Sequence, residues 1–315
     1  MTAGSQTRKY SHVAVLKGGW SAEREVSLRS GAACAAALRE AGYKVTEIDV
    51  GRDIAQVLAE ARPDACFNAL HGRWGEDGSV QGVLECLGIP YTHSGVLASA
   101  LAMHKGRAKR IMSAAGVPTA EDTIVDREAA AFAHALPPPY VAKPIAEGSS
   151  VGVVIVPAGA ARPPEAIRKI PDMGGQIMVE RYIAGRELTC GVIDGRATAI
   201  IEIVQKDGLE FYDYEAKYAP GGSKHILPAS LPPDVAARIQ YHTLNAHNAL
   251  GCRGVSRADF RYDDTPGGMG EIVCLEVNTQ PGMTGTSLIP ELAQHAGMSF
   301  PELVTLIIED ASLDR

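Results

Sequence analysis

Two carboxylates and an asparagine near the C-terminus are spaced so that they could share one site. Asp259 lies in the segment SRADFRY, and Glu276 and Asn278 lie in the segment IVCLEVN, with the turn-rich DDTPGG between them. If the two segments pair as an antiparallel hairpin around that turn, Asp259 lies across from Glu276, and Arg257 lies across from Asn278. Carboxylate and amide oxygens suit hard cations, so this group indicates magnesium chemistry on phosphates.

Side-chain alternation along the second strand makes a further prediction. Cys274 is expected on the same face as the two metal-ligand candidates of its strand, whereas Val273, Leu275 and Val277 are expected to face a core. An alternative interpretation is a solvated sheet face with ordinary cross-strand charge pairs. Features elsewhere in the chain favour the catalytic interpretation.

A lysine within an apolar strand, and the loop after it, indicate phosphate binding. Lys143 lies in the strand-like PYVAKP, and a lysine on a buried strand needs a partner. The loop AEGSSVGV follows, and its glycines and serines permit close backbone approach and offer amide donors. An exposed edge position would also explain the lysine, and GSSVG alone is a weak pattern.

The first hundred residues read as a parallel α/β unit. Strands are expected at HVAVL, YKVTEIDV and DACFNAL. One helix is expected to begin at a Ser21 cap and to end at Gly42, and a second helix is expected in GSVQGVLECLG. Ligand groups in such units lie on loops after the carboxyl ends of strands, here KGGWSAE and HGRWGEDG. Neither loop is G-x-G-x-x-G, and G-x-x-x-x-G-K-[ST] does not occur, so the Rossmann dinucleotide and P-loop classes lack their fingerprints.

The elements expected after residue 94 must position Lys143 and the hairpin of Asp259 and Glu276. Residues 94–116 are expected to form a helix whose basic residues, Lys109 among them, lie mostly on the surface. Strands are expected at QIMVERYI, ELTCGVID and RATAIIEIV, the last two joined by a tight Asp-Gly turn. FYDYEAKYAPGGSKHILPA is expected to be a long functional loop, and PPDVAARIQYHTLNAHNALG an amphipathic helix. Two short helices close the chain.

Size and composition exclude several classes. At 315 residues and 33.2 kDa the chain can form two or three compact lobes. A net charge of −7 argues against a nucleic-acid partner. No apolar run is long enough to span a bilayer, and the N-terminus does not read as a signal peptide. The six cysteines lack C-x-x-C spacing, as is typical of thiols in a reducing compartment, so we expect a cytoplasmic protein without a membrane partner.

Six segments together resemble the D-alanine–D-alanine ligase family of the ATP-grasp superfamily. They are GGWSAEREVSLRSG, HGRWGEDGSVQG, AKPIAEGSSVG, FYDYEAKY, GVSRADF and LEVNTQPGMTGTSLIP, in the family's order over almost the whole chain. The resemblance implies an α/β ATP-grasp fold of three lobes. The expected lobes are an N-terminal parallel, Rossmann-like α/β substrate-binding domain (1–95), a central ATP-grasp lobe with the glycine/serine loop (96–185), and a C-terminal lobe with the magnesium site and lid loop (186–315).

The resemblance also implies the reaction. The carboxylate of one D-alanine attacks the γ-phosphoryl group of ATP, and the amine of a second D-alanine attacks the resulting D-alanyl phosphate. The products are D-alanyl-D-alanine, ADP and phosphate, for peptidoglycan precursor synthesis. Family members are usually homodimers, so the implied partners are D-alanine, ATP and a second copy of the chain.

Metal and nucleotide ligands follow from the same resemblance. Asp259, Glu276 and Asn278 are implied to hold two Mg²⁺ ions, with Glu276 bridging them, and Mn²⁺ can substitute. ATP is a substrate. The residues implied to bind it are Lys105, Lys143, Gly148, Ser149, Ser150, Val151, Glu180, Arg181, Ile183, Glu187 and Lys217.

Further residues are implied to act on the amino-acid substrates. Arg257 and the backbone amide of Gly282 would stabilise the tetrahedral oxyanion. Glu23 would bind the ammonium group of the first D-alanine, with His71 near it, although Glu23 could instead favour a helix N-terminus and His71 could satisfy a loop carbonyl. The other implied residues are Lys217 at the phosphoryl group or substrate, Ser287 and Leu288 at the second carboxylate, and Ser150 and Tyr218 in a triad with Glu23.

Departures from the family pattern leave alternatives open. Trp20, His104, Gln280 and the pair 285–286 differ from the family's usual residues, but none of them is a proposed metal or phosphate ligand. A ligase that joins D-alanine to D-lactate or D-serine is one alternative, and Tyr218 argues for an amine acceptor instead of D-lactate. A non-catalytic nucleotide-binding module is a second alternative, and the retained ligands argue against it.

Overall fold

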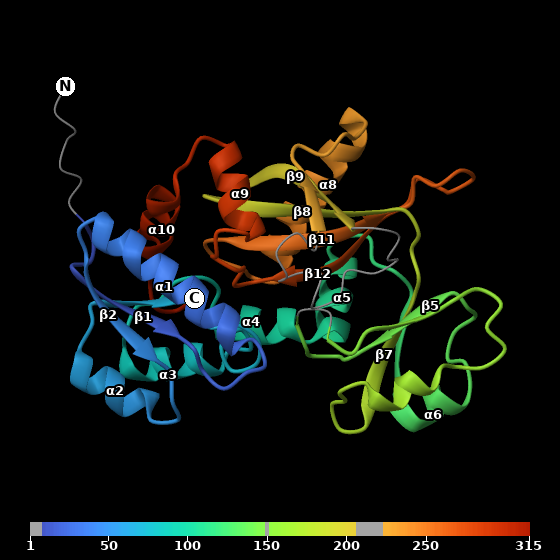
Figure 1. Ribbon diagram of the computed structural model, residues 1–315, viewed down its shortest axis with the longest axis horizontal. Coiled ribbons are helices and arrows are strands. Elements are labelled where there is room, and N and C mark those ends of the chain that lie inside the picture. Colours follow the sequence, from blue (N-terminus) through green and yellow to red (C-terminus); the bar gives the residue numbers. More distant parts are fainter. Residues whose placement is uncertain (1–7, 149–150, 206–222) are drawn as a thin grey trace.

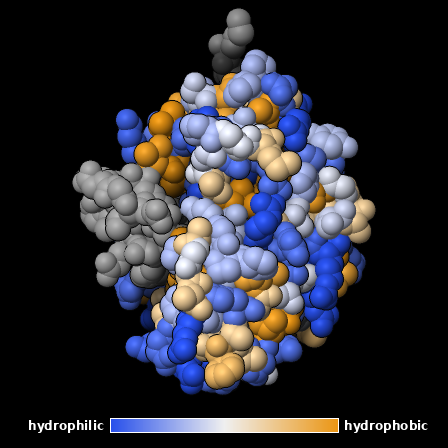
Figure 2. All heavy atoms as spheres, turned by 90° about the vertical axis from the view of Figure 1, so that its right-hand side faces the viewer, coloured by the Kyte–Doolittle hydropathy of each residue, from blue (hydrophilic) through white to orange (hydrophobic). Residues whose placement is uncertain are grey.

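Three sheets lie in separate lobes of the molecule (Figure 1). The computed structural model describes residues 8–148, 151–205 and 223–315. Within those ranges, none of the helices combines the length and the apolar character needed to cross a bilayer. All six cysteines are unpaired thiols, and all but Cys86 are buried. Figure 2 shows small hydrophobic patches scattered among hydrophilic residues on the face that includes the central lobe.

The first lobe is a parallel sheet in the order β2-β1-β3, as the sequence predicts. Its elements are β1 (His12–Lys17), α1 (Arg24–Glu40), β2 (Lys44–Asp49), α2 (Ile54–Ala61), β3 (Ala65–Asn68) and α3 (Ser79–Leu87). The sequence patterns did not indicate α2. Ser21 is not the cap of α1, because the helix begins at Arg24 and Glu23 holds the N-cap position. The Ser21 hydroxyl instead donates to the backbone oxygen of His71 (2.7 Å) and so joins two loops.

The other two sheets are antiparallel, with the orders β4-β7-β5-β6 and β10-β9-β8-β11-β12. The central sheet comprises β4 (Asp122–Asp126), β5 (Tyr140–Lys143), β6 (Val154–Val156) and β7 (Gln176–Arg181), with α6 (Arg127–Phe132) and η1 (Glu165–Lys169) beside it. The C-terminal sheet comprises β8 (Arg186–Ile193), β9 (Arg196–Gln205), β10 (Ser223–Ile226), β11 (Ser256–Tyr262) and β12 (Ile272–Asn278), with α8 (Pro233–Ala249) packed against it. The predicted Asp-Gly turn joins β8 to β9, and both of its residues have positive φ. Part of the expected long loop is instead strand β10.

The basic helix expected at 94–116 is two helices, α4 (Val96–Met103) and α5 (Lys105–Ala114). His104 separates them because its backbone is extended, and its ring nitrogen Nδ1 accepts a hydrogen bond from the amide of Arg107 (3.3 Å). Lys109 is not on the surface as expected, since only 2% of it is exposed. Its partners are described with the site below.

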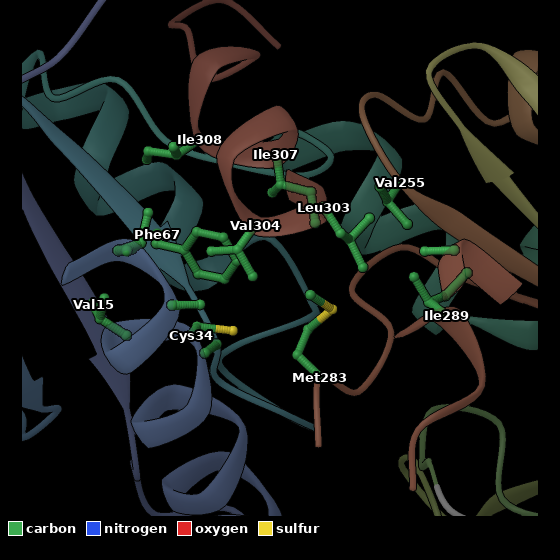
Figure 3. Packing of buried hydrophobic residues seen from close by; sticks show 14 of the residues in the cluster. Val15, Cys34, Phe67, Val255, Met283, Ile289, Leu303, Val304, Ile307 and Ile308 are labelled. Atoms are coloured by element: carbon green, nitrogen blue, oxygen red, sulfur yellow. The ribbon is translucent and has the colours of Figure 1, made fainter. Parts of the chain in front are cut away.

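C-terminal helices complete the core of the first lobe (Figure 3). Helix α10 (Phe300–Glu309) packs on α1 and β3, and its Leu303 and Val304 share one buried cluster with Phe67. Met283, in the loop before α9 (Leu288–His295), belongs to the same cluster. This packing holds the loop at residues 279–287 against the first lobe.

The predicted hairpin register is confirmed at the two pairs that matter for the site. Arg257 pairs with Asn278, and Asp259 pairs with Glu276. A β-bulge then shifts the register, so Phe260 pairs with Cys274 and Leu275 is the extra residue. The expected orientation of Cys274 was therefore wrong. The extra residue shifts the alternation of the strand by one, so Cys274 faces the opposite side of the sheet from Glu276.

The bulge determines which residues of β12 lie on each face of the sheet. Cys274 packs in the core with Phe260 and Val277, whereas Val273 clusters with Ile183, and Leu275 lies against that cluster. Leu275 also lines the cleft between the two antiparallel sheets. The bulge therefore supplies an apolar wall to the cleft beside the polar hairpin residues.

Two buried histidines make the free energy of unfolding depend on pH. Burial, and to a smaller extent the charge of Arg253, lower the pKa of His247 to about 4. Burial likewise lowers the pKa of His93 to about 3. An unfolded histidine binds its proton near pH 6.5. The stability that these neutral rings contribute is therefore present at neutral pH and is lost as the pH falls below about 6.5.

We expect His247→Gln to reduce the loss of unfolding free energy between pH 7 and pH 5 by roughly 1–2 kcal/mol. Urea unfolding at both pH values measures this loss. Asn248→Gln, at an exposed position of the same helix, is the control and should leave the pH dependence as it is. Equal pH dependence in His247→Gln and the unaltered protein would contradict the assignment.

Candidate active site

Two adjoining pockets contain every predicted site residue that the structure describes. The first pocket lies between the two antiparallel sheets, and its predicted residues are Lys105, Lys143, Val151, Glu180, Arg181, Ile183, Glu187, Asp259 and Glu276. The second pocket reaches the first lobe, and its predicted residues are Glu23, His71, Gly148, Glu187, Arg257, Asp259, Glu276, Asn278, Gly282, Ser287 and Leu288. Ser149, Ser150, Lys217 and Tyr218 lie outside the described residues.

Carboxylates at the junction of the two pockets each face a side-chain cation. Asp259 Oδ1 and Oδ2 accept hydrogen bonds from Arg257 Nε and Nη2, both at 2.9 Å, and Oδ2 also accepts from Asn278 Nδ2 at 3.2 Å. Glu276 Oε2 is 2.9 Å from Lys105 Nζ. The hairpin register places both carboxylates side by side, with a cation from strand β11 at Asp259 and a cation from helix α5 at Glu276.

Magnesium ligands were predicted at this junction. Across the described parts of the chain, no group of three or more His, Cys, Asp or Glu side chains is arranged to hold a metal ion. The predicted donor set instead combines two carboxylates with the amide of Asn278. Such oxygen donors, completed by substrate phosphates and water, are the kind that magnesium uses.

A buried ion cluster forms one wall of the first pocket. Glu180 is 3% exposed, and its two carboxylate oxygens accept from Lys143 Nζ and from Lys109 Nζ, the latter at 2.9 Å. Lys109 Nζ is also 3.0 Å from Asp122 Oδ1. Burial opposes the charge of Glu180, but the attraction of Lys143 and Lys109 outweighs it and holds the pKa of this carboxyl below its ordinary value. Lys143 thus has the partner that a buried lysine requires.

The role of Lys109 behind this site was not predicted from the sequence. Lys109 does not line the pocket, but its ammonium group compensates the negative charges of Glu180 and Asp122.

We expect Lys109→Met to lower the free energy of unfolding by about 3–5 kcal/mol, because it leaves buried negative charge without its cation. Denaturant unfolding measures the change. The matched control Arg110→Met, at an exposed position of the same helix, should stay within about 0.5 kcal/mol; a similar effect of both changes would contradict this role.

The first-lobe side of the second pocket is built from the two loops that the sequence indicated. The imidazole of His71 is 3.1 Å from Glu76 Oε1 through Nδ1 and 2.9 Å from Ser30 Oγ through Nε2. Burial is the main cause that raises the pKa of Glu76, with the nearby charge of Glu23 adding to it. Glu76 was not among the predicted site residues, although it lies in the motif HGRWGEDG.

Glycines permit close approach in this pocket. A Cβ at Gly282 would lie 2.8 Å from Ser287 Oγ, and one at Gly148 would lie 3.0 Å from Glu23 Oε2. Ser287 Oγ accepts from the amide of Thr284 at 2.9 Å, and Leu288 begins helix α9. Thr284, Ser287 and Leu288 all line the second pocket, so the loop before α9 and the N-terminus of that helix form part of its wall.

Gln280, one of the departures, has a structural role. Its side chain is 2% exposed, its Oε1 accepts from Asn68 Nδ2 at 2.5 Å, and its Nε2 donates to the backbone oxygen of Leu70. It therefore ties the loop after β12 to the end of β3 in the first lobe. This contact helps to close the second pocket.

A central sheet that carries a buried lysine, facing a C-terminal sheet that carries paired carboxylates, defines the ATP-grasp class of enzymes. The family model of the D-ala D-ala ligase N-terminus matches residues 50–94, and that of the D-ala D-ala ligase C-terminus matches residues 111–309. The chain belongs to the D-alanine–D-alanine ligase family.

Three similar proteins agree with this placement. A D-alanine–D-alanine ligase of Methylobacterium radiotolerans is 65% identical, over 96% of this chain and 99% of its own length. The structure of the ligase from Bacillus anthracis complexed with ATP has a TM-score of 0.76 and 32% identity, and the match covers 96% of each chain. The VanG D-Ala:D-Ser ligase from Enterococcus faecalis has a TM-score of 0.76 and 29% identity, over 95% of this chain and 99% of that chain.

Proposed function

We propose that this protein joins two D-alanines in an ATP-dependent reaction that proceeds through D-alanyl phosphate and yields D-alanyl-D-alanine, ADP and phosphate. The observation that carries the proposal is the junction of the two pockets at Asp259 and Glu276. One pocket is walled by lysines and apolar strand residues, as a nucleotide requires. The other is lined by Glu23, Arg257 and the start of α9, as an amino acid requires.

Nucleotide binding is assigned to the first pocket. Arg181 and Ile183 would present backbone groups to the adenine ring beside Glu180, and Glu187 would hold the ribose hydroxyls. Lys105 and Lys143 would contact phosphates, with the amides of the loop that contains Gly148 and Val151. The part of that loop at residues 149–150 is assigned the same role by the family resemblance alone.

Metal binding is assigned to Asp259, Glu276 and Asn278. Their oxygens would hold two magnesium ions, with Glu276 as a shared ligand, and Lys105 and Arg257, which contact these carboxylates, would then be available to substrate oxygens. When bound, the ions would offset the charge of the triphosphate. Mn²⁺ would fit the same oxygen donors.

Substrate handling is assigned to the second pocket. Glu23 would accept hydrogen bonds from the ammonium group of the first D-alanine, with His71 beside it. Arg257 and the amide of Gly282 would donate to the oxyanion that forms when the amine attacks. Ser287 and the amide of Leu288 would hold the second carboxylate at the N-terminus of α9, where the helix favours negative charge.

The division into lobes at residues 95 and 185, the homodimer and the cytoplasmic location belong to the same proposal. Strand β8 begins at Arg186, which supports the second boundary. The use of ATP for a peptidoglycan precursor supports the location. D-alanine, ATP and a second copy of the chain are the proposed partners.

An acceptor panel tests the proposal. ADP release would be measured with D-alanine alone, with L-alanine alone, and with D-alanine plus D-serine or D-lactate, and the products would be identified by mass. We expect ADP release with D-alanine and a product of the mass of D-alanyl-D-alanine. A predominance of the D-serine or D-lactate product would assign a different acceptor, and ATP binding without turnover would identify a non-catalytic module.

Tyr218 is proposed to favour the amine acceptor over D-lactate. An attacking amine must lose a proton, and a phenol that the family resemblance links to Ser150 and Glu23 would take part, although its ordinary pKa of about 10 makes it a poor base by itself. We expect Tyr218→Phe to cost roughly 1–3 kcal/mol in dipeptide formation and to raise the depsipeptide fraction, most at low pH. Product masses from mixed acceptors across pH measure this; an unchanged product ratio would contradict it.

A further inference from the structure

A third pocket lies in the first lobe, outside the carboxyl ends of all three parallel strands. It is lined by residues 18–21 after β1, by residues from 50–54 after β2, and by residues from 70–83 after β3, and its cavity volume is about 270 Å³. Crevices at this edge of an open α/β sheet are where ligands generally bind. The volume is just below the roughly 300–1,000 Å³ of small-molecule sites, so it suits a ligand of one or two rings.

Two indole rings line this pocket. The ring centroids of Trp20 and Trp74 are 5.8 Å apart, with the planes tilted by 43°. Trp20 is 40% exposed, although it is a large apolar side chain. The apolar residues that complete the lining are Val50, Ile54, Leu70, Val80 and Val83. These surfaces favour a planar, apolar ligand body.

Positive charge accompanies each indole. The guanidinium carbon of Arg52 is 5.2 Å from the Trp20 ring centroid, and that of Arg73 is 4.8 Å from the Trp74 ring centroid. Among the residues that the structure describes, no Asp or Glu lines the pocket, although the chain as a whole has a net charge of −7. Two arginines without a carboxylate in the lining favour an anionic ligand.

The backbone at this pocket is unusual. Trp74 has φ of +77°, a conformation that a bulky residue rarely adopts. Such conformations cluster at functional sites, because the surrounding structure must hold them in place. Here the residue with this strained backbone is Trp74 itself, so the strained conformation places one of the two indole rings in the pocket lining.

We propose that this pocket binds a small planar aromatic anion, with its ring against Trp20 and Trp74 and its acid group at Arg52 and Arg73. The site is separate from the nucleotide pocket, which shares none of its lining residues. His71 lines both this pocket and the amino-acid pocket, and the contact of Ser21 with His71 joins the loops between them. A ligand here therefore contacts the outer side of the loops that hold the proposed first-substrate residues.

Intrinsic fluorescence reports on this pocket alone, because Trp20 and Trp74 are the only two tryptophans of the chain. The probe is 4-nitrobenzoate, a planar anion that quenches indole emission, titrated into the full chain with saturating ADP in the nucleotide pocket. We expect saturable quenching, and weaker binding of the neutral analogue 4-nitrobenzamide. Quenching that rises linearly without saturation, or equal affinity for the neutral analogue, would overturn the proposal.

A charge-reversed variant separates this site from nonspecific contact. Arg52→Glu combined with Arg73→Glu keeps both tryptophans and changes only exposed residues, and we expect it to raise the dissociation constant at least about tenfold. Arg238→Glu, at an exposed position on α8, is the matched control and should leave the dissociation constant unchanged. Circular dichroism verifies that both variants are folded. Equal affinity in the double variant and the control would overturn the assignment of the acid group.

Discussion

Glu276→Gln is expected to reduce turnover by roughly 10²- to 10³-fold or more, since it removes several kcal/mol of charge stabilisation at the proposed metal site. Glu276 lines both pockets, and its carboxylate faces Lys105 in the structure. The substitution keeps the size of the side chain but removes the negative charge that would lie between two divalent cations. We therefore expect magnesium-dependent nucleotide binding to weaken as well.

Steady-state kinetics over a range of magnesium concentrations, with calorimetry of ADP binding, measure both effects. Thermal unfolding should change little, because Glu276 faces the cleft instead of the core. The control Glu60→Gln makes the same chemical change at an exposed position of α2 and should retain full activity. Near-normal turnover of Glu276→Gln at ordinary magnesium would contradict the assignment.

Arg257→Lys is expected to lower kcat by roughly 10²- to 10³-fold, the cost of losing one oxyanion donor. Lysine keeps the charge but cannot form the two hydrogen bonds that Arg257 makes with Asp259, so the donor loses its position. Arg257 lines the second pocket and not the first. Nucleotide affinity should therefore stay near that of the unaltered protein, unlike that of Glu276→Gln.

Comparison of kcat with the dissociation constant of ADP distinguishes the two roles. Arg238→Lys, at an exposed position of α8, is the control and should change neither quantity. A loss of ADP affinity in Arg257→Lys as large as the loss of kcat would place Arg257 in nucleotide binding. An unchanged kcat would remove it from the mechanism.

The hairpin register could be predicted from sequence, because strand periodicity and a turn between two strands leave few possible pairings. The parallel first lobe was predictable for a similar reason, since its strands, helices and glycine-rich loops alternate. The bulge at Leu275 could not be predicted, because an extra residue leaves no mark in an alternating polar and apolar pattern. It reversed the expected face of Cys274.

The residues that the sequence missed are those whose roles depend on contacts far along the chain. Lys109 looks like one more basic residue of a helix until Glu180 and Asp122 surround its ammonium group. Gln280 reads as a departure from a motif until its amide meets the end of β3. Local patterns report periodicity and turns, whereas buried partners depend on how the lobes pack.

Oxygen transfer shows directly whether a D-alanine carboxylate attacks the γ-phosphoryl group of ATP. The purified protein would be given ATP and D-alanine labelled with ¹⁸O in the carboxylate, and the phosphate and dipeptide would be analysed by mass. One carboxylate oxygen bonds to phosphorus as the bond to ADP breaks, and it leaves with phosphate when the amine attacks the carbonyl carbon. We expect one labelled oxygen in phosphate for each dipeptide formed. Unlabelled phosphate, or AMP and pyrophosphate in place of ADP and phosphate, would contradict it.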